Sequence, residues 1–219
     1  GLQRDRRDGC GVTRVGIGYD SHRFAPGRRL ILGGQEIPHV LGLAGHSDAD
    51  AVAHALTDAI LGAAAAGNIG ELFPDTDPQW KDADSMALLR TAAALVEGRG
   101  FRIVQADITV ITEAPKLAAF LPAVATTLET ALGLPHRSIG VKAKTNEGMG
   151  FIGRGEGLAV IAVATVEACR SNRSSAGSPR FPPWRCTLFS PSWPPSRTSF
   201  LPCPLTLPWH SARSSRIAG

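Results

Sequence analysis

The sequence has few aromatic residues, no long apolar run and no closely paired cysteines, and each shortage excludes a class of protein. Aromatic side chains make up 6% of the 219 residues, so the core has to be built mainly from Ala, Val, Leu and Ile. Asp, His or Gly interrupts the Ala-rich runs well before the roughly 20 residues of a membrane span, so no transmembrane helix is expected. The four cysteines are scattered and form no CxxC pair, which argues against a disulfide framework and a thiolate zinc site.

Lysine and acidic residues are absent from residues 171–219, which hold six arginines. The formal net charge of +4 therefore comes from this end, because the remaining 17 basic residues face 19 acidic ones. Ser- and Pro-rich stretches without a period of 2 or 3.6 predict a disordered tail over 169–219. A basic, Trp-containing tail could also bind nucleic acid or anionic lipid, and a frame-shifted or vector-derived end is a further alternative. We prefer an unstructured extension, with no nucleic-acid and no membrane partner.

Between residues 13 and 168 strand patterns alternate with helix patterns, which is typical of a single two-layer α/β domain with helices packed on a mixed sheet. Strands are expected in five segments: 13–19, 29–34, 101–112, 139–145 and 158–168. Helices are expected in three: 48–66, 85–98 and 116–132. A Pro- and Asp-containing loop is expected at 67–82.

Local patterns refine these elements. In the first strand Val15, Ile17 and Tyr19 alternate in the manner of a half-buried strand. The last strand is apolar on both faces, which is typical of a strand covered on both sides.

Two helix starts are also indicated by local patterns. Ser47 followed by Asp50 has the form of a capping box for the first helix. Pro115 is expected to begin the helix at 116–132, and Gly133 to end it.

Polar residues at the end of the first strand and inside the first helix suggest a metal site. Asp20 and His22 lie on the same side of an extended strand. His54 sits in an Ala- and Leu-rich helix and needs a polar partner, because burying its ring nitrogens unpaired is costly. One carboxylate and two imidazoles with an open fourth position make up the ligand set of a catalytic zinc site, and Asp58 is expected to orient the His54 ring. The alternative is a surface Asp–His pair and a satisfied core histidine.

Two segments have features of phosphate binding. His46 and Ser47 precede the first helix, where free backbone N–H groups favour anions. Residues 142–157 carry five glycines, three cations, Thr145 and Glu147. The glycines let backbone amides approach an anion, and a carboxylate there could hold a hard metal ion. The alternative is a Gly-rich hairpin with solvated charges.

Five stretches together resemble the 2-C-methyl-D-erythritol 2,4-cyclodiphosphate synthase family of the non-mevalonate route to isoprenoids. They occur in order, without large gaps, and leave residues 1–12 and the tail outside the resemblance. The stretches are GYDSHRF (18–24), GHSDADAVAHALTDAILGAAA (45–65), GNIGELFPDTDP (67–78), ITEAPKL (111–117) and KAKTNEGMGFIGRGEG (142–157).

The resemblance implies a phosphorus–oxygen lyase that works as a homotrimer, with each active site shared between neighbouring subunits. The substrate would be 4-diphosphocytidyl-2-C-methyl-D-erythritol 2-phosphate, whose 2-phosphate attacks its own β-phosphorus and releases CMP. Zn²⁺, or another divalent transition metal, would bind Asp20, His22 and His54. Mg²⁺ or Mn²⁺ would bind Glu147.

Roles for further residues are implied by the same resemblance. His46 and Thr145 match positions that stabilise the transition state. The positions that match substrate contacts are Ser47, Asn68, Gly70, Phe73, Asp75, Asp77, Thr112, Ala114, Pro115, Lys116, Lys144, Phe151 and Arg154.

Three positions depart from the family pattern, and two other functions remain open. Asn68 stands where the family commonly has an aspartate that accepts ribose hydrogen bonds, and Lys144 and Asn146 replace threonines. The competing functions are a zinc hydrolase that uses the same ligands and a catalytically silent nucleotide-binding scaffold.

The ends and the location of the chain are open to more than one interpretation. Residues 1–12 are expected to be a flexible leader or linker, left from a transit peptide or from a fused upstream cytidylyltransferase domain. The expected location is a bacterial cytoplasm, or a plastid or similar organelle if a transit peptide was removed.

Overall fold

The computed structural model describes residues 12–80 and 82–169. The predicted leader, apart from Val12, and the predicted tail, apart from Cys169, lie outside the described residues. Cys169 is exposed and donates its backbone N–H to the Gly100 carbonyl at 2.7 Å. No helix within the described ranges is both long and apolar enough to cross a membrane.

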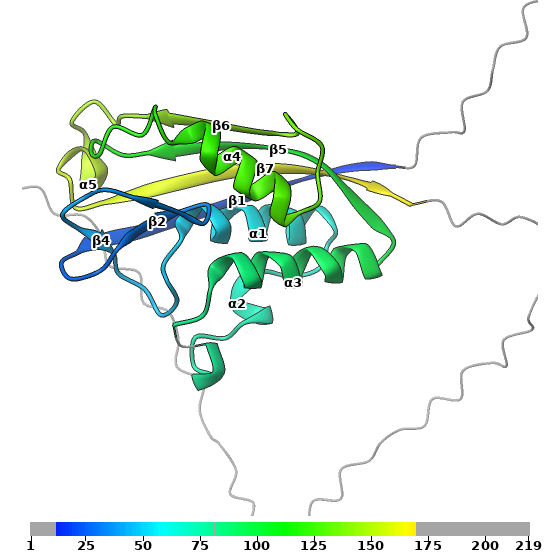
Figure 1. Cartoon of the computed structure of the whole chain (residues 1–219). Helices are drawn as coiled ribbons and strands as arrows, with labels where there is room; N and C mark the ends of the chain where they lie inside the picture. Colours follow the sequence, from blue (N-terminus) through cyan, green and yellow to red (C-terminus); the bar gives the residue numbers. More distant parts are fainter. Residues whose placement is uncertain (1–11, 81, 170–219) are drawn as a thin grey trace, which may run out of the picture. The chain divides into compact units, whose positions relative to one another are not determined.

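A five-stranded sheet in the order β4-β1-β7-β5-β6 forms one layer of the fold (Figure 1). Only β5 and β6 run parallel, and the other neighbours are antiparallel, so the sheet is mixed as expected. β2 and β3 form a separate two-stranded hairpin. The strands are β1 (Thr13–Ala25), β2 (Leu30–Leu32), β3 (Gln35–Ile37), β4 (Gly42–Leu43), β5 (Phe101–Ile111), β6 (Ile139–Lys144) and β7 (Gly157–Ala168).

Three helices form the second layer and enclose one hydrophobic core with the sheet (Figure 1). α1 (Ala51–Ala63) packs on β1 and β7, α3 (Ser85–Gly98) on α1 and β5, and α4 (Leu121–Ala131) on β6. The short helices are α2 (Ile69–Leu72), α5 (Gly150–Gly153) and the 3₁₀ turn Pro78–Trp80. The prediction of an α/β domain with helices packed on a mixed sheet is confirmed.

The apolar residues of β1 face away from the core, which the sequence pattern did not indicate. Val15, Ile17 and Tyr19 are 64%, 70% and 55% exposed. Gly16 and Gly18 point toward α1 instead, and a Cβ on them would lie 2.1 Å from the Ala59 oxygen and 1.9 Å from the Ala55 oxygen. The glycines thus let the helix backbone lie directly against the strand.

β7 also differs from the expectation of a strand covered on both sides. Leu158, Val160 and Ala162 are buried under α1, whereas Ile161 and Val163 on the opposite face are only half-buried in the single chain. Together β1 and β7 present a broad apolar face that no helix covers within the described residues.

Several predicted boundaries are wrong for local reasons. The first helix starts at Ala51, because Asp50 and not Ser47 is the N-cap, accepting the Val52 and Ala53 N–H groups at 3.0 and 3.1 Å. The last long helix starts at Leu121 instead of 116. The expected loop at 67–82 contains α2 and the 3₁₀ turn, and β3, β4 and α5 were not expected.

Candidate metal centre and adjoining cleft

Three side chains from two elements converge beside the start of α1. Asp20 and His22 come from β1, and His54 comes from the second turn of α1. Asp20 Oδ2 lies 2.8 Å from His22 Nε2 and 3.1 Å from His54 Nδ1, and the two nitrogens are 3.3 Å apart. The alternation of the strand and the close approach of α1 to Gly18 bring the three together.

These three residues fit a divalent metal ion. A tetrahedral ion with bonds of about 2.0–2.1 Å separates its ligands by roughly 3.3 Å, which is close to the observed spacings. A carboxylate and two imidazoles are donors that suit zinc and its neighbours.

The other ring nitrogen of each histidine has a defined partner. His22 Nδ1 lies 2.6 Å from the Ala44 carbonyl, which can only accept, so Nδ1 carries the proton and Nε2 is left for the metal. His54 Nε2 lies 2.8 Å from Ser85 Oγ and 3.1 Å from Ser47 Oγ. The two histidines therefore face the shared point through different nitrogens.

The electrostatics of the cluster favour a charged carboxylate. Burial would raise the pKa of Asp20, but hydrogen bonds and charge from His22 and His54 outweigh it and hold this pKa well below its usual range. Burial lowers the pKa of His22, yet the Asp20 carboxylate raises it overall. A metal ion thus competes with a proton at His22.

The expectation that Asp58 orients His54 is wrong. Asp58 accepts the backbone N–H of Ile69 at 2.7 Å and so joins α1 to the start of α2. Burial raises the pKa of Asp58, opposed by this hydrogen bond. Ser85 takes the orienting place, and no sequence motif singled it out, because its contact with His54 depends on how α3 packs on α1.

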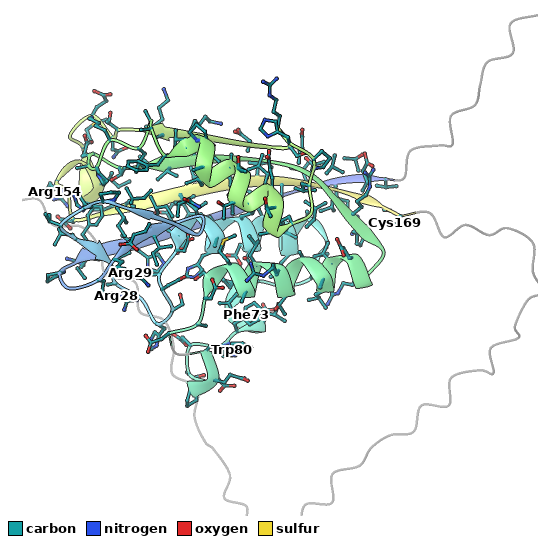
Figure 2. The ribbon with its side chains drawn as sticks, viewed as in Figure 1. Arg28, Arg29, Phe73, Trp80, Arg154 and Cys169 are labelled. Carbon is teal, nitrogen blue, oxygen red and sulfur yellow. The ribbon has the colours of Figure 1, made fainter. Side chains whose placement is uncertain are left out.

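A cleft of about 390 Å³ adjoins the cluster. Five residues predicted to act on the substrate line it together with His22 and His54: His46, Ser47, Gly70, Phe73 and Asp75. Arg28 was not predicted, but it donates to the carbonyls of Gly45 at 3.0 Å and Ser47 at 2.5 Å and so holds the loop before α1 (Figure 2).

Trp80 and Leu88 also line the cleft and were missed by sequence reasoning. The rings of Phe73 and Trp80 meet edge to face with centroids 5.0 Å apart (Figure 2). Trp80 Nε1 is buried without a hydrogen-bond partner among the described residues. The sequence signal that could have indicated Trp80 is an aromatic residue at the end of the segment FPDTDPQW, which begins with the predicted Phe73.

A second group of predicted residues lies at the ends of the parallel strands β5 and β6, separated from β1 by β7. Here Thr145 Oγ1 donates to Glu147 Oε1 at 2.9 Å, and Glu113 Oε1 accepts the N–H groups of Asn146 and Gly148. The described lining of the cleft includes none of this group, whose predicted members are Thr112, Ala114, Pro115, Lys116, Lys144, Thr145 and Glu147.

The remaining predicted residues have structural partners. Asn68 is the N-cap of α2, and Asp77 Oδ1 accepts the Gln79 N–H at 3.0 Å in the 3₁₀ turn. Phe151 lines a smaller hollow of about 190 Å³ next to His22, and Arg154 pairs with Glu156 at 2.6 Å. None of these four residues lies in the described lining of the main cleft.

Comparison with known proteins places most of the chain in one family. Residues 13–167 match the YgbB family. The 2-C-methyl-D-erythritol 2,4-cyclodiphosphate synthase of Gloeobacter violaceus is 54% identical over 154 residues, which cover 70% of this chain and 94% of the relative.

Solved structures are similar as well. One titled as the 2C-methyl-D-erythritol-2,4-cyclodiphosphate synthase in its CDP-bound form is 42% identical, with a TM-score of 0.65, over 70% of this chain and 99% of its own. The bifunctional IspDF of Campylobacter jejuni is 45% identical with a TM-score of 0.70, over 72% of this chain and 43% of its own length.

Proposed function

The chain belongs to the YgbB family, and on this premise we propose that it catalyses the reaction for which its relatives are named, closure of 2-C-methyl-D-erythritol 2,4-cyclodiphosphate. It is a lyase of isoprenoid biosynthesis. The observation that carries the proposal is the Asp20–His22–His54 cluster, which opens on a cleft in a chain 54% identical to a synthase.

The reaction is an intramolecular phosphoryl transfer. An oxygen of the substrate's 2-phosphate attacks the β-phosphorus and forms a new P–O–P bond. The bond from the β-phosphorus to the oxygen bridging to the α-phosphate breaks, and CMP leaves with that oxygen. No water is consumed, so the site has mainly to hold two anions together and neutralise the charge that develops.

Zn²⁺ at Asp20, His22 and His54 fits this task, and Mg²⁺ or Mn²⁺ at Glu147 would complete it. A bound divalent ion supplies positive charge to phosphate oxygens. His46 and Ser47, held by Arg28 at the edge of the cleft, are placed to contact the erythritol phosphate. Phe73 and Asp75 line the part of the cleft that would take the methylerythritol unit.

Two features support a homotrimer with shared sites. The uncovered face of β1 and β7 is apolar over Val15, Ile17, Tyr19, Ile161 and Val163, as an interface between copies requires. The group around Thr145 and Glu147 is separated from the metal cluster within one chain, so a neighbouring subunit would supply it. Ala114, Pro115 and Lys116 would then contact the cytosine of the substrate, and a related structure in a CDP-bound form is consistent with a substrate linked to cytidine diphosphate.

Locations in a bacterial cytoplasm or in a plastid-like organelle remain predictions. A cell fractionation of the source organism would decide between them.

The activity test uses the whole chain, with Zn²⁺, Mg²⁺ and the cytidylyl substrate. We expect CMP and the cyclic diphosphate in equal amounts. His54→Ala should lose bound zinc and more than about a hundredfold of the rate, because it removes a metal ligand. His39→Ala is the matched control and should retain both the zinc and the rate. Among the described residues His39 hydrogen-bonds only to Leu41, and its ring packs against Phe24.

Three results would contradict the proposal or part of it. Zinc retention in His54→Ala would overturn the ligand assignment. Binding of CDP without any CMP formation would favour a nucleotide-binding scaffold. Release of inorganic phosphate in place of the cyclic product would favour a hydrolase.

A further inference from the structure

A chain of hydrogen bonds leads away from the metal cluster into the protein. Ser85 Oγ lies 2.8 Å from His54 Nε2 and donates to Asp48 Oδ1. We propose that Asp48 acts through Ser85 to set the proton position and the orientation of the His54 ring. Asp48 and Ser85 are then positioning residues of the metal centre. The inference rests on the proposed function only in taking His54 as a metal ligand.

The number of protons shared by Asp48, Ser85 and His54 determines which nitrogen of His54 carries its proton. The Asp48 carboxylate can only accept, so the single hydroxyl proton of Ser85 points to Asp48. Ser85 Oγ can then only accept, and His54 Nε2 has to be the donor that faces it. The proton of His54 therefore sits on Nε2, and the lone pair of Nδ1 points to Asp20 and His22.

Ser47 does not disturb this assignment. Its Oγ lies 3.1 Å from His54 Nε2 and 3.2 Å from Ser85 Oγ, and it accepts the Ala49 N–H at 3.1 Å. Ser85 Oγ has a second lone pair, so the Ser47 hydroxyl can donate to it beside His54. In this arrangement the His54 Nε2 proton and the hydroxyl protons of Ser47 and Ser85 each have an acceptor.

Further hydrogen bonds fix the position of Asp48 relative to Ser85. Its backbone N–H donates to the Ala83 carbonyl at 3.2 Å, and its carboxylate accepts the backbone N–H of Ser85 at 3.3 Å. Ser85 is fully buried as the first residue of α3. Asp48 thus ties the loop before α1 to the start of α3, and the site depends on two helices keeping one spacing.

The test measures zinc affinity by competition with a chromophoric chelator, without substrate. Ser85→Ala should weaken zinc binding about 10- to 100-fold, as loss of a ligand's outer hydrogen-bond partner does. Asp48→Asn should weaken it in the same direction. Because Asp48 acts through Ser85, the double variant should be no weaker than Ser85→Ala alone.

A matched control separates positioning from general loss of stability. Thr57→Val removes another fully buried hydroxyl, which bonds to the Ala53 carbonyl on α1 and not to the cluster. It should leave the zinc affinity unchanged. A second measurement is the ¹H–¹⁵N signal of His54 Nε2–H in the zinc-loaded protein. It should be slow to exchange in the wild type and lost in Ser85→Ala.

Two groups of contrary results separate the inference from the proposed function. Unchanged affinity in Ser85→Ala, equal losses in Ser85→Ala and Thr57→Val, or additive effects of Asp48→Asn and Ser85→Ala would each overturn the inference. Failure of the wild type to release CMP, with the Ser85 dependence of zinc binding intact, would overturn the synthase function alone.

Discussion

Asn68 shows how one side chain can serve the fold with the atoms that the substrate would need. Its Oδ1 accepts the Glu71 N–H at 3.0 Å, and its Nδ2 donates to Glu71 Oε1 at 2.7 Å. An aspartate here would add an acceptor for ribose hydroxyls but would repel Glu71. We therefore expect Asn68→Asp alone to change the affinity for CDP little. Asn68→Asp combined with Glu71→Gln should bind CDP up to about tenfold more tightly.

Isothermal titration calorimetry measures the affinity for CDP. Glu71→Gln alone is the control, and its affinity should match that of the wild type. Equal affinity of the double variant and the wild type would show that residue 68 does not contact the ribose.

Single residues were predictable where the chemistry is local. Asp20 and His22 share a side of a strand, and a histidine in an Ala-rich helix needs a polar partner, so the sequence could indicate these residues as a candidate metal site. The family resemblance then joined the three into one ligand set, and the structure brings them together. Ser85 and Trp80 could not, because their contacts depend on how distant segments pack. The error at Asp58 has the same cause, since the start of α2 takes its carboxylate.

At the scale of secondary-structure elements, the contact between β1 and α1 decides both stability and the site. A Cβ at Gly18 would lie 1.9 Å from the Ala55 backbone oxygen, so Gly18→Ala has to push α1 away from the strand. We expect a loss of about 1–3 kcal/mol in the free energy of unfolding. Zinc binding should also weaken, because His54 precedes Ala55 on the displaced helix.

Chemical denaturation and chelator competition measure the two effects. Gly62→Ala on the same helix is the matched control, because its Cβ would meet only the Ile17 oxygen, at 3.9 Å. It should raise stability by about 0.5–1 kcal/mol. A Gly18→Ala protein as stable as the wild type would contradict the close packing.

Elements with long periodic patterns were predictable, and those fixed by tertiary contacts were not. α3 has the expected bounds, 85–98. β2 lies within the expected strand 29–34, but its partner β3 was missed. The turn between them depends on a distant residue, Asp50, whose carboxylate accepts the Gly33 and Gly34 N–H groups at 2.8 and 2.7 Å. Burial raises the pKa of Asp50, and these N–H groups oppose the shift.

At the scale of the whole molecule, the described residues leave the apolar face of β1 and β7 uncovered, and the proposed homotrimer would bury it. Alternation in β1 was read correctly as a strand, but which face meets the core depends on α1 packing against Gly16 and Gly18. The alternation of apolar residues could not indicate this, because glycine counts as neither apolar nor polar. The exposed face of β1 carries its apolar side chains, so the sequence pattern alone assigns the wrong face to the core.

Ile17, 70% exposed at the centre of this face, offers the test of assembly. Ile17→Asp would bury a charge in an interface, which is costly, so we expect a monomer by light scattering. It should keep its helical content and its zinc, because the three ligands belong to one chain. It should lose CMP release, because Thr145 and Glu147 would no longer reach the cluster from a neighbour. Val40→Asp, at an apolar residue 86% exposed outside the sheet, should keep the mass and the activity of the wild type. An active monomer would mean that one chain holds a complete site.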